Sequence, residues 1–134
     1  MSSYSVMRAG EAPDYTQGKA SPFLGYGRPM GSEQLALNFR VLAPGAAHVP
    51  PGGDPTKGHS HVNIEEIYLV IEGELTMKVG DDVHTLGPRD AILMAPGTPR
   101  GARNDTDGET AFAMISVKVA DQSTETNTHE GFWP

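Results

Sequence analysis

The sequence contains no cysteine, and this absence removes several kinds of chemistry at once. Disulfide bonds, thiolate metal sites and cysteine nucleophiles are excluded, so histidine and carboxylate side chains remain as the strong metal ligands. The sequence also has no apolar stretch of about 18 residues, the length that a membrane-spanning helix requires. A basic start followed by an apolar core is missing as well. We therefore expect a cytoplasmic protein without membrane contact.

Basic residues are few and dispersed. Ten Lys and Arg stand against 17 Asp and Glu, which gives the chain a net charge of -7. Such a chain repels a phosphate backbone unless its basic side chains gather on one face, and the sequence shows no run of Lys or Arg. We expect neither nucleic acid nor an anionic membrane surface as a partner.

Turn-forming residues, in contrast, are abundant. The 134 residues include 16 Gly and 11 Pro, which indicates frequent turns rather than long helices. The length suits one domain with one core and leaves no room for a second domain. These features favour an all-β protein.

Clear strand periodicity begins at residue 34. In the segment 34–41, the apolar Leu35, Leu37, Phe39 and Val41 alternate with Ala36, Asn38 and Arg40. This period of two is typical of a half-buried strand. Further strands are predicted at 65–72, 75–79, 83–86, 91–94 and 110–119, with one more after the proline-glycine corner at 95–99.

These strands divide the chain into three parts. Residues 1–33 lack periodicity and predict an extended arm, residues 34–119 predict a β-barrel, and residues 120–134 predict a polar tail that ends in aromatic residues. Short strands at close, even spacing are typical of a sandwich or barrel. Because such a sheet has edges to protect, we expect a homodimer, with the arm as a candidate for pairing across it.

A histidine pair and a carboxylate stand out within the barrel. His59 and His61 are two residues apart, so in an extended backbone their side chains point to the same face. A bend at 62–64 would bring the carboxylate of Glu66 beside both imidazoles. Two imidazoles and one carboxylate suit a divalent transition metal (Fe, Mn, Ni, Co or Zn) and leave positions open for a ligand. The alternative is a chance His-x-His followed by a solvated pair, Glu65 and Glu66.

The spacing of these residues resembles the first signature of the cupin superfamily. Its fixed positions are occupied by Gly53, His59, His61, Glu66 and Gly73. The resemblance implies the cupin double-stranded β-helix, a jelly-roll barrel, as the fold. It also implies a metal bound by His59, His61 and Glu66, and it selects Glu66 over Glu65.

Residues 89–104 resemble the second cupin signature only in part. Gly97 and Asn104 match it, but Arg89 stands in place of a Gly and Arg100 in place of the His that is a metal ligand in cupins with a full site. A guanidinium stays protonated and offers no lone pair to a metal.

Two interpretations of Arg100 are open. Pointing inward, it would present a planar fork to a substrate carboxylate or phosphate; pointing outward, it would pair with Asp90 or Glu109. Tyr68 lies on the same strand face as Glu66, and is either a proton donor at the site or an aromatic residue of the barrel wall.

The remaining histidines and large apolar residues receive simpler interpretations. His48, His84 and His129 are expected at the surface, with His48 as a reserve fourth ligand should its loop fold over the barrel mouth. The residues expected to form the core and line the pocket are Phe39, Met77, Met94, Phe112 and Met114.

Two functions remain in view. In the first, the protein is an enzyme whose bound metal acts on a small oxygen-rich anionic organic molecule, in a dioxygenase, decarboxylase, isomerase or lyase type of reaction. In the second, the protein is a non-catalytic cupin that binds a small anionic ligand, with Arg100 supplying the charge that the metal would supply. The fold does not choose between them.

Overall fold

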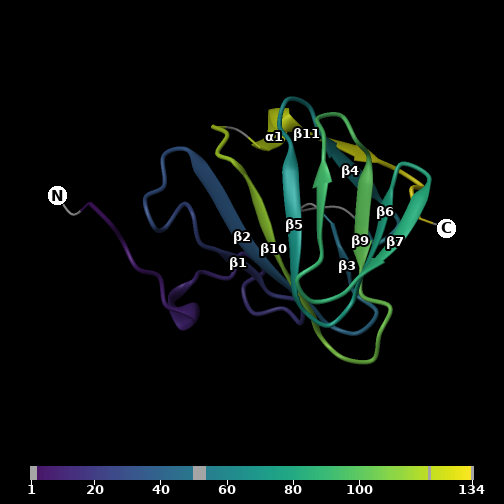
Figure 1. The fold of residues 1–134 in the computed structure, drawn as a ribbon, viewed down its shortest axis with the longest axis horizontal. Helices are drawn as coiled ribbons and strands as arrows, with labels where there is room; N and C mark the ends of the chain where they lie inside the picture. Colours follow the sequence, from purple (N-terminus) through teal and green to yellow (C-terminus); the bar gives the residue numbers. More distant parts are fainter. Residues whose placement is uncertain (1–2, 50–53, 121, 134) are drawn as a thin grey trace.

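Two antiparallel sheets form the computed structural model of the chain (Figure 1). It describes residues 3–49, 54–120 and 122–133. The first sheet has the order β1-β2-β10-β5-β8, which are β1 (Phe23–Gly25), β2 (Leu35–Leu42), β10 (Thr110–Val117), β5 (Glu66–Glu72) and β8 (Ala91–Met94). The second has the order β11-β4-β9-β6-β7, which are β11 (Thr126–His129), β4 (Gly58–His61), β9 (Arg100–Arg103), β6 (Leu75–Val79) and β7 (Asp82–Leu86), and β3 (Ala47–His48) pairs with β9.

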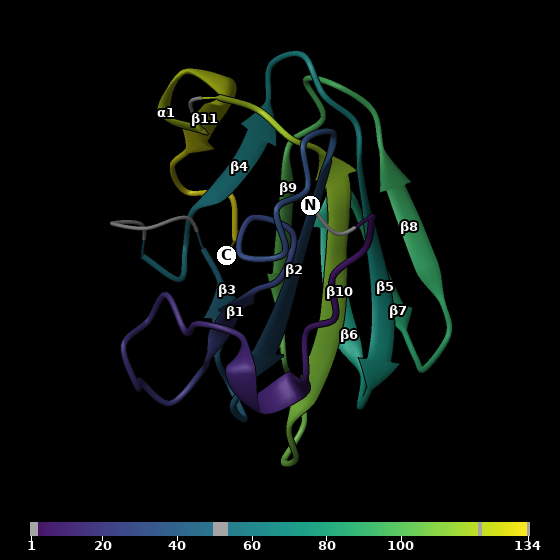
Figure 2. The same cartoon turned by 90° about the vertical axis from the view of Figure 1, so that its left-hand side faces the viewer.

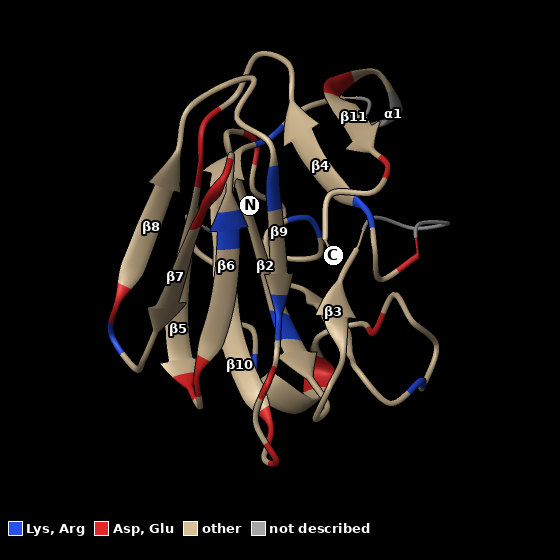
Figure 3. Ribbon diagram, turned by 90° about the vertical axis from the view of Figure 1, so that its right-hand side faces the viewer, with Lys and Arg blue, Asp and Glu red and all other residues tan. Residues whose placement is uncertain are grey.

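The strand order confirms the all-β jelly-roll prediction. Strands far apart in sequence lie side by side, since β10 pairs with both β2 and β5, and the chain passes between the two sheets (Figure 2). In the described part of the chain, the helical elements are two short turns, η1 (Ala9–Glu11) and α1 (Gln122–Glu125). No helix in the described residues is long and apolar enough to cross a membrane. Lys and Arg lie among Asp and Glu on the side shown in Figure 3.

The core fills the space between the sheets. Alternate residues of each strand point inward, as the pleat of a strand requires. The buried cluster consists of Leu42, Tyr68, Val70, Leu75, Met77, Met94, Ala102, Phe112 and Met114. The predicted core positions Met77, Met94, Phe112 and Met114 are therefore confirmed.

Strand β2 has the opposite orientation to the one that its sequence pattern favours. Arg40 is only 8% exposed, whereas Leu35 is 61% exposed. Arg40 is paired with the buried Phe112 of β10. The residues of β2 on the same side as Arg40, which alternate with the apolar ones, therefore face the interior. Phe39, predicted in the core, instead packs against Tyr26 at a ring-centroid distance of 6.4 Å.

The sheets extend beyond both ends of the predicted barrel. Strand β1 lies within the arm and pairs with β2, and β11 lies within the tail and pairs with β4. The tail then packs against the second sheet, where Trp133 is 6% exposed and the guanidinium carbon of Arg103 lies 4.1 Å from its ring centroid. A Cβ on Gly101 would overlap the indole of Trp133, so glycine makes room for the ring.

Three signature positions, Gly73, Arg89 and Gly97, carry a left-handed backbone. Gly73, which closes the first signature, has φ 74°, and a Cβ there would overlap the backbone of Glu109. Arg89, which stands where the second signature has Gly, has φ 72°. This conformation favours glycine, so Arg89 keeps the signature's turn at a cost in backbone strain. Gly53, which opens the first signature, lies outside the described residues.

Candidate metal centre

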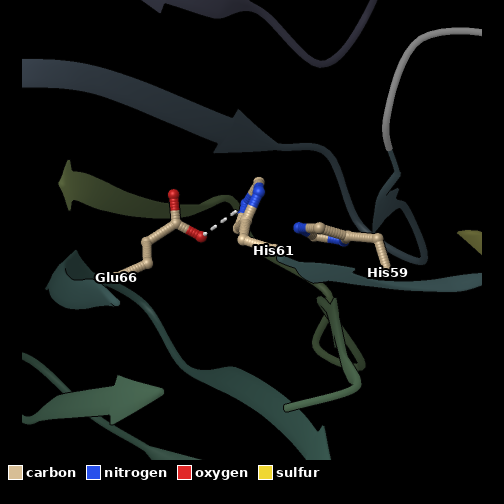
Figure 4. Close-up of side chains that lie close together, drawn as sticks. All are labelled: His59, His61 and Glu66. Carbon is tan, nitrogen blue, oxygen red and sulfur yellow. Dashed lines mark ion pairs between the residues drawn. The ribbon is translucent and has the colours of Figure 1, made fainter. Parts of the chain in front are cut away.

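Strands β4 and β5 bring the three predicted ligands to one point. His59 and His61 occupy alternate positions of β4, and Glu66 is the first residue of β5. Figure 4 shows the two imidazoles and the carboxylate converging from these strands. One ligand atom from each residue lies within 4.8 Å of the other two, and both histidines are buried. These side chains could hold a metal ion.

His61 is held on both sides of its ring. Its Nε2 lies 3.4 Å from Oε1 of Glu66, and its Nδ1 lies 3.3 Å from the hydroxyl of Thr126 on β11. When Nδ1 is protonated and donates to that hydroxyl, the lone pair of Nε2 points toward the carboxylate, where the three candidate ligand atoms meet. Thr126 belongs to the segment expected as a tail, so only its pairing with His61 across β4 and β11 reveals this contact.

A cavity of about 430 Å³ opens onto the three residues. His59, His61, Glu66 and Tyr68 line it together with apolar side chains such as those of Ile64, Phe23 and Met114. Two exposed cations, Arg28 and Lys118, also border it. A largely apolar cavity with a few convergent polar groups is typical of a small-molecule site.

His48 is not a surface histidine, and that prediction is wrong. It is 6% exposed on the short strand β3, and it lines the cavity. Its ring centroid lies 5.9 Å from that of His59 and 6.0 Å from that of Tyr68. It is outside the group of three that could share one ion. No local pattern in the sequence predicts this burial, because it depends on the pairing of β3 with β9.

The other two histidines lie away from the cavity. His84 is exposed on β7, as predicted. His129, on β11, is half-buried, and its Nε2 lies 2.8 Å from the hydroxyl of Ser60.

Burial keeps the inner imidazoles neutral. Burial, and after it the neighbouring His48 and Arg100, lower the pKa of His59 to about 2. Burial and the charge of Arg40 lower the pKa of His48 to about 3. A neutral imidazole has a free lone pair, so the state in which His59 can bind a metal is the one present at neutral pH.

Tyr68 lies inside the barrel with its hydroxyl unpartnered. Its side chain is fully buried, and its hydroxyl has no hydrogen-bond partner among the described residues. Burial, and then the negative charge of Glu66, raises the pKa of this hydroxyl well above its usual value. Tyr68 therefore carries its proton at neutral pH at the wall of the cavity.

Arg100 points into the barrel, so the outward alternative, in which it pairs with Asp90 or Glu109, is wrong. Its side chain is 0% exposed, and its Nε donates to Sδ of Met94 at 3.3 Å. Nη1 and Nη2 have no hydrogen-bond partner among the described residues. Arg100 is not among the residues that line the cavity, so its guanidinium lies within the barrel wall.

Comparison with known proteins identifies the family. The family model of the cupin domain matches residues 45–117, which include β3 to β10 and all three candidate ligands. The chain belongs to the cupin family. Within this cupin, the first signature corresponds to β4, the bend after it and β5, and the second signature includes β9 with Arg100.

Several known proteins are similar to this cupin. A β-D-galactosidase of Mycobacterium tuberculosis is 30% identical over 119 residues, which cover 86% of this chain and 92% of that protein. The H2HPP isomerase of Bacillus subtilis is 39% identical over 64 residues, 47% of this chain but only 26% of that protein. The solved structure of a sugar phosphate isomerase of the cupin superfamily from Silicibacter pomeroyi has a TM-score of 0.66 and 20% identity, covering 82% of this chain and 76% of that one.

Proposed function

We propose that this cupin binds a divalent transition metal through His59, His61 and Glu66 and acts on a small oxygen-rich organic anion in the adjoining cavity. The observation that carries the proposal is the meeting of these three ligand atoms within 4.8 Å of one another beside a cavity of about 430 Å³. The donor set suits Fe, Mn, Ni, Co or Zn, and Glu66 Oε1 and His59 Nδ1 are buried without a hydrogen-bond partner among the described residues. When bound, the metal would supply Lewis acidity or activate oxygen.

The surrounding charges support an anionic ligand. Arg100 forms no ion pair with a carboxylate among the described residues, and Arg28 and Lys118 border the cavity. Arg28 and Lys118 thus border the cavity and Arg100 lies opposite the cavity-lining His59, although the whole chain carries a net charge of -7. An anion there would lower the cost of burying a guanidinium away from water.

Tyr68 is the proton donor of this proposal. Its hydroxyl has no hydrogen-bond partner in the part of the chain that the structure describes, is protonated at neutral pH and lies on the cavity wall, so it can donate to a ligand oxygen. Arg100 does not line the cavity, so it acts on the ligand through its positive charge, from the position opposite His59 on the neighbouring strand. The similar proteins include an isomerase, a galactosidase and a sugar phosphate isomerase, which agrees with an oxygen-rich ligand.

Metal analysis of protein purified without a histidine tag tests the proposal. We expect about one transition-metal ion per chain, and we expect His61→Ala to lose it because two remaining ligands hold an ion far more weakly. His84→Ala is the matched control, since His84 is exposed on β7. Wild-type protein that contains no metal and refuses added Zn²⁺, Mn²⁺ or Fe²⁺ would contradict the proposal.

A second function is favoured by one observation, the fully buried guanidinium of Arg100, whose Nη1 and Nη2 have no hydrogen-bond partner among the described residues. In it, the barrel binds a small anionic ligand without metal, and Arg100 supplies the positive charge. This function predicts that metal-free Arg100→Met protein binds a small dicarboxylate more than tenfold less tightly than metal-free wild-type protein does. Equal affinity of the two proteins would rule it out.

A further inference from the structure

Three consecutive backbone N–H groups lie in the bend between β4 and β5. The bend consists of residues 62–64 and follows His61 directly, and Glu66 begins β5 two residues later. The shape of this bend therefore decides where the Glu66 carboxylate lies relative to the two histidines. A backbone N–H group that leaves the strand ladder needs another partner, because an unpaired one costs free energy.

One residue of the tail, Glu125, accepts hydrogen bonds from all three of these groups. Its backbone carbonyl accepts from Val62 N at 2.8 Å, and its Oε1 accepts from Asn63 N at 2.5 Å and from Ile64 N at 3.0 Å. The side-chain amide of Asn63 also donates to Oε2, at 3.3 Å. Glu125 is 7% exposed, so the bend supplies hydrogen-bond donors to a carboxylate that is largely removed from water. Bonds to a charged acceptor are roughly twice as strong as bonds between neutral groups.

The next residue, Thr126, reaches a candidate ligand directly. Its hydroxyl lies 3.3 Å from His61 Nδ1, and its side chain lines the cavity. Ile64, whose N–H group Glu125 accepts, lines the same cavity. Glu125 and Thr126 therefore hold the candidate metal centre at two points, which are the bend that leads to Glu66 and the ring of His61.

The pairing of β11 with β4 places both of these tail residues. Glu125 ends α1 and Thr126 begins β11, and Thr126 is paired with His61 in the register of the two strands. Figure 2 shows α1 and β11 beside β4. Both residues lie beyond residue 117, where the match to the cupin domain ends. These contacts therefore come to the metal centre from outside the matched domain.

We propose that Glu125 is a positioning residue of the metal centre and fixes the bend that aims Glu66 at the two histidines. Thr126 complements it by setting the tautomer of His61. The inference rests on the proposed metal site and adds to it a residue that does not touch the metal. A carboxylate ligand on a loose bend must be ordered when the ion binds, and that ordering lowers the affinity. Glu125 holds the bend before the ion binds, so the ligand set is preorganised.

A purely structural role for Glu125 makes a different prediction. A carboxylate that only stabilises the fold contributes to the free energy of unfolding, and its loss leaves the metal affinity of the folded protein unchanged. A positioning residue contributes to that affinity itself. Loss of a contact that orients a metal ligand typically weakens metal binding about 10-fold to 100-fold.

The Zn²⁺ affinity of the full chain, measured at pH 7 by competition with a fluorescent chelator, tests the inference. We expect Glu125→Ala to bind Zn²⁺ about 10-fold to 100-fold more weakly than wild type, with both proteins shown to be folded by circular dichroism. Glu125→Gln keeps one accepting oxygen but loses the charge, so we expect a smaller loss, at least about threefold. Glu130→Ala is the matched control and should keep the wild-type affinity, because it removes a carboxylate of the same tail that is 83% exposed.

Two further measurements report the geometry of the site. Bound Co²⁺ absorbs visible light according to its coordination, and we expect Glu125→Ala to change that spectrum because Glu66 no longer points at the ion. Hydrogen exchange of the Asn63 and Ile64 amides in metal-free protein should be at least about tenfold faster in Glu125→Ala than in wild type.

Thr126→Val tests the second contact. The valine has nearly the same shape as the threonine but cannot accept the proton of His61 Nδ1. We expect about tenfold weaker Zn²⁺ binding and a mixture of His61 tautomers, seen in the ¹⁵N chemical shifts of the ring. A Thr126→Val protein with wild-type affinity and a single tautomer would remove Thr126 from the inference.

The results separate this inference from the proposed function. Wild-type protein that refuses Zn²⁺ would overturn both, since no ligand set would then need positioning. Equal Zn²⁺ affinity and equal Co²⁺ spectra in wild type and Glu125→Ala would overturn the inference alone, as would an equal loss in Glu130→Ala. Should Glu125→Ala not fold, Glu125→Gln decides: wild-type affinity together with wild-type exchange at Asn63 and Ile64 would overturn the inference.

Discussion

His59 and Arg100 lie directly opposite each other on the antiparallel strands β4 and β9. Side chains at opposed positions share one face of a sheet, with Cβ atoms about 5 Å apart. A candidate metal ligand therefore has a permanent cation as its cross-strand neighbour inside the barrel. In cupins with a full site, a histidine ligand stands where this chain has Arg100.

Replacement of that cation by histidine should strengthen metal binding. Arg100→His removes a positive charge and adds an imidazole beside His59, so we expect Zn²⁺ to bind at least about tenfold more tightly than in wild type. Arg100→Met removes the charge without adding a ligand, and separates the two effects. Competition with a fluorescent chelator measures both affinities. Zn²⁺ binding by Arg100→His that is no tighter than by Arg100→Met would show that the new imidazole does not reach the ion.

Acid should destabilise the metal-free protein through its buried histidines. Unfolding restores the pKa of His48 and His59 to about 6.5, whereas in the folded protein these values are about 3 and about 2. Between these values the unfolded chain binds more protons than the folded one, so the free energy of unfolding falls as pH drops from about 6.5 toward 3. At pH 5 each histidine should account for about 2 kcal/mol of this loss.

Urea unfolding at pH 7 and pH 5 measures the effect. His48→Gln removes one of the two groups, so we expect it to lose about half of the pH dependence. The exposed His84 gives a control, because His84→Gln should keep the wild-type dependence. A His48→Gln protein with the full wild-type dependence would show that His48 is not buried neutral.

The packing of Trp133 against Gly101 should contribute much of the free energy that keeps the C-terminal tail on the barrel. Trp133→Ala removes a nearly buried indole, for which we expect a loss of about 3–5 kcal/mol in the free energy of unfolding. Gly101→Ala places a methyl group where the indole lies, and should be costly for the same reason. In the double variant the two costs should not add, since the methyl group then has room. Fully additive costs, measured by chemical unfolding, would mean that the two residues do not share this contact.

Relief of backbone strain at Arg89 should stabilise the protein. Arg89 is exposed and has φ 72°, a conformation that costs a residue with a side chain about 1–2 kcal/mol. Arg89→Gly removes that strain but raises the conformational entropy of the unfolded chain. We therefore expect the free energy of unfolding to rise by about 0.5–1 kcal/mol. Arg89→Ala keeps the strain and should stay within about 0.5 kcal/mol of wild type. A glycine variant no more stable than the alanine variant would contradict this explanation.

The sequence by itself determined most of the strands and the identity of the three candidate metal ligands. Alternation and turn residues predicted six of the strands close to their observed bounds, because a strand's period and its turns are local properties. The spacing of His59, His61 and Glu66 predicted their convergence, since two of the three lie on one strand face and the third follows a short bend.

Only the tertiary structure decided which face of each strand is inside. Both faces of β2 carry apolar residues, and its long-range pairing with β10 turns Arg40 inward and Leu35 outward. The same dependence on distant partners buries His48 through β9 and brings Thr126 to His61 through β11. A one-residue shift in pairing exchanges the two faces of a strand, so no local pattern could have fixed these positions.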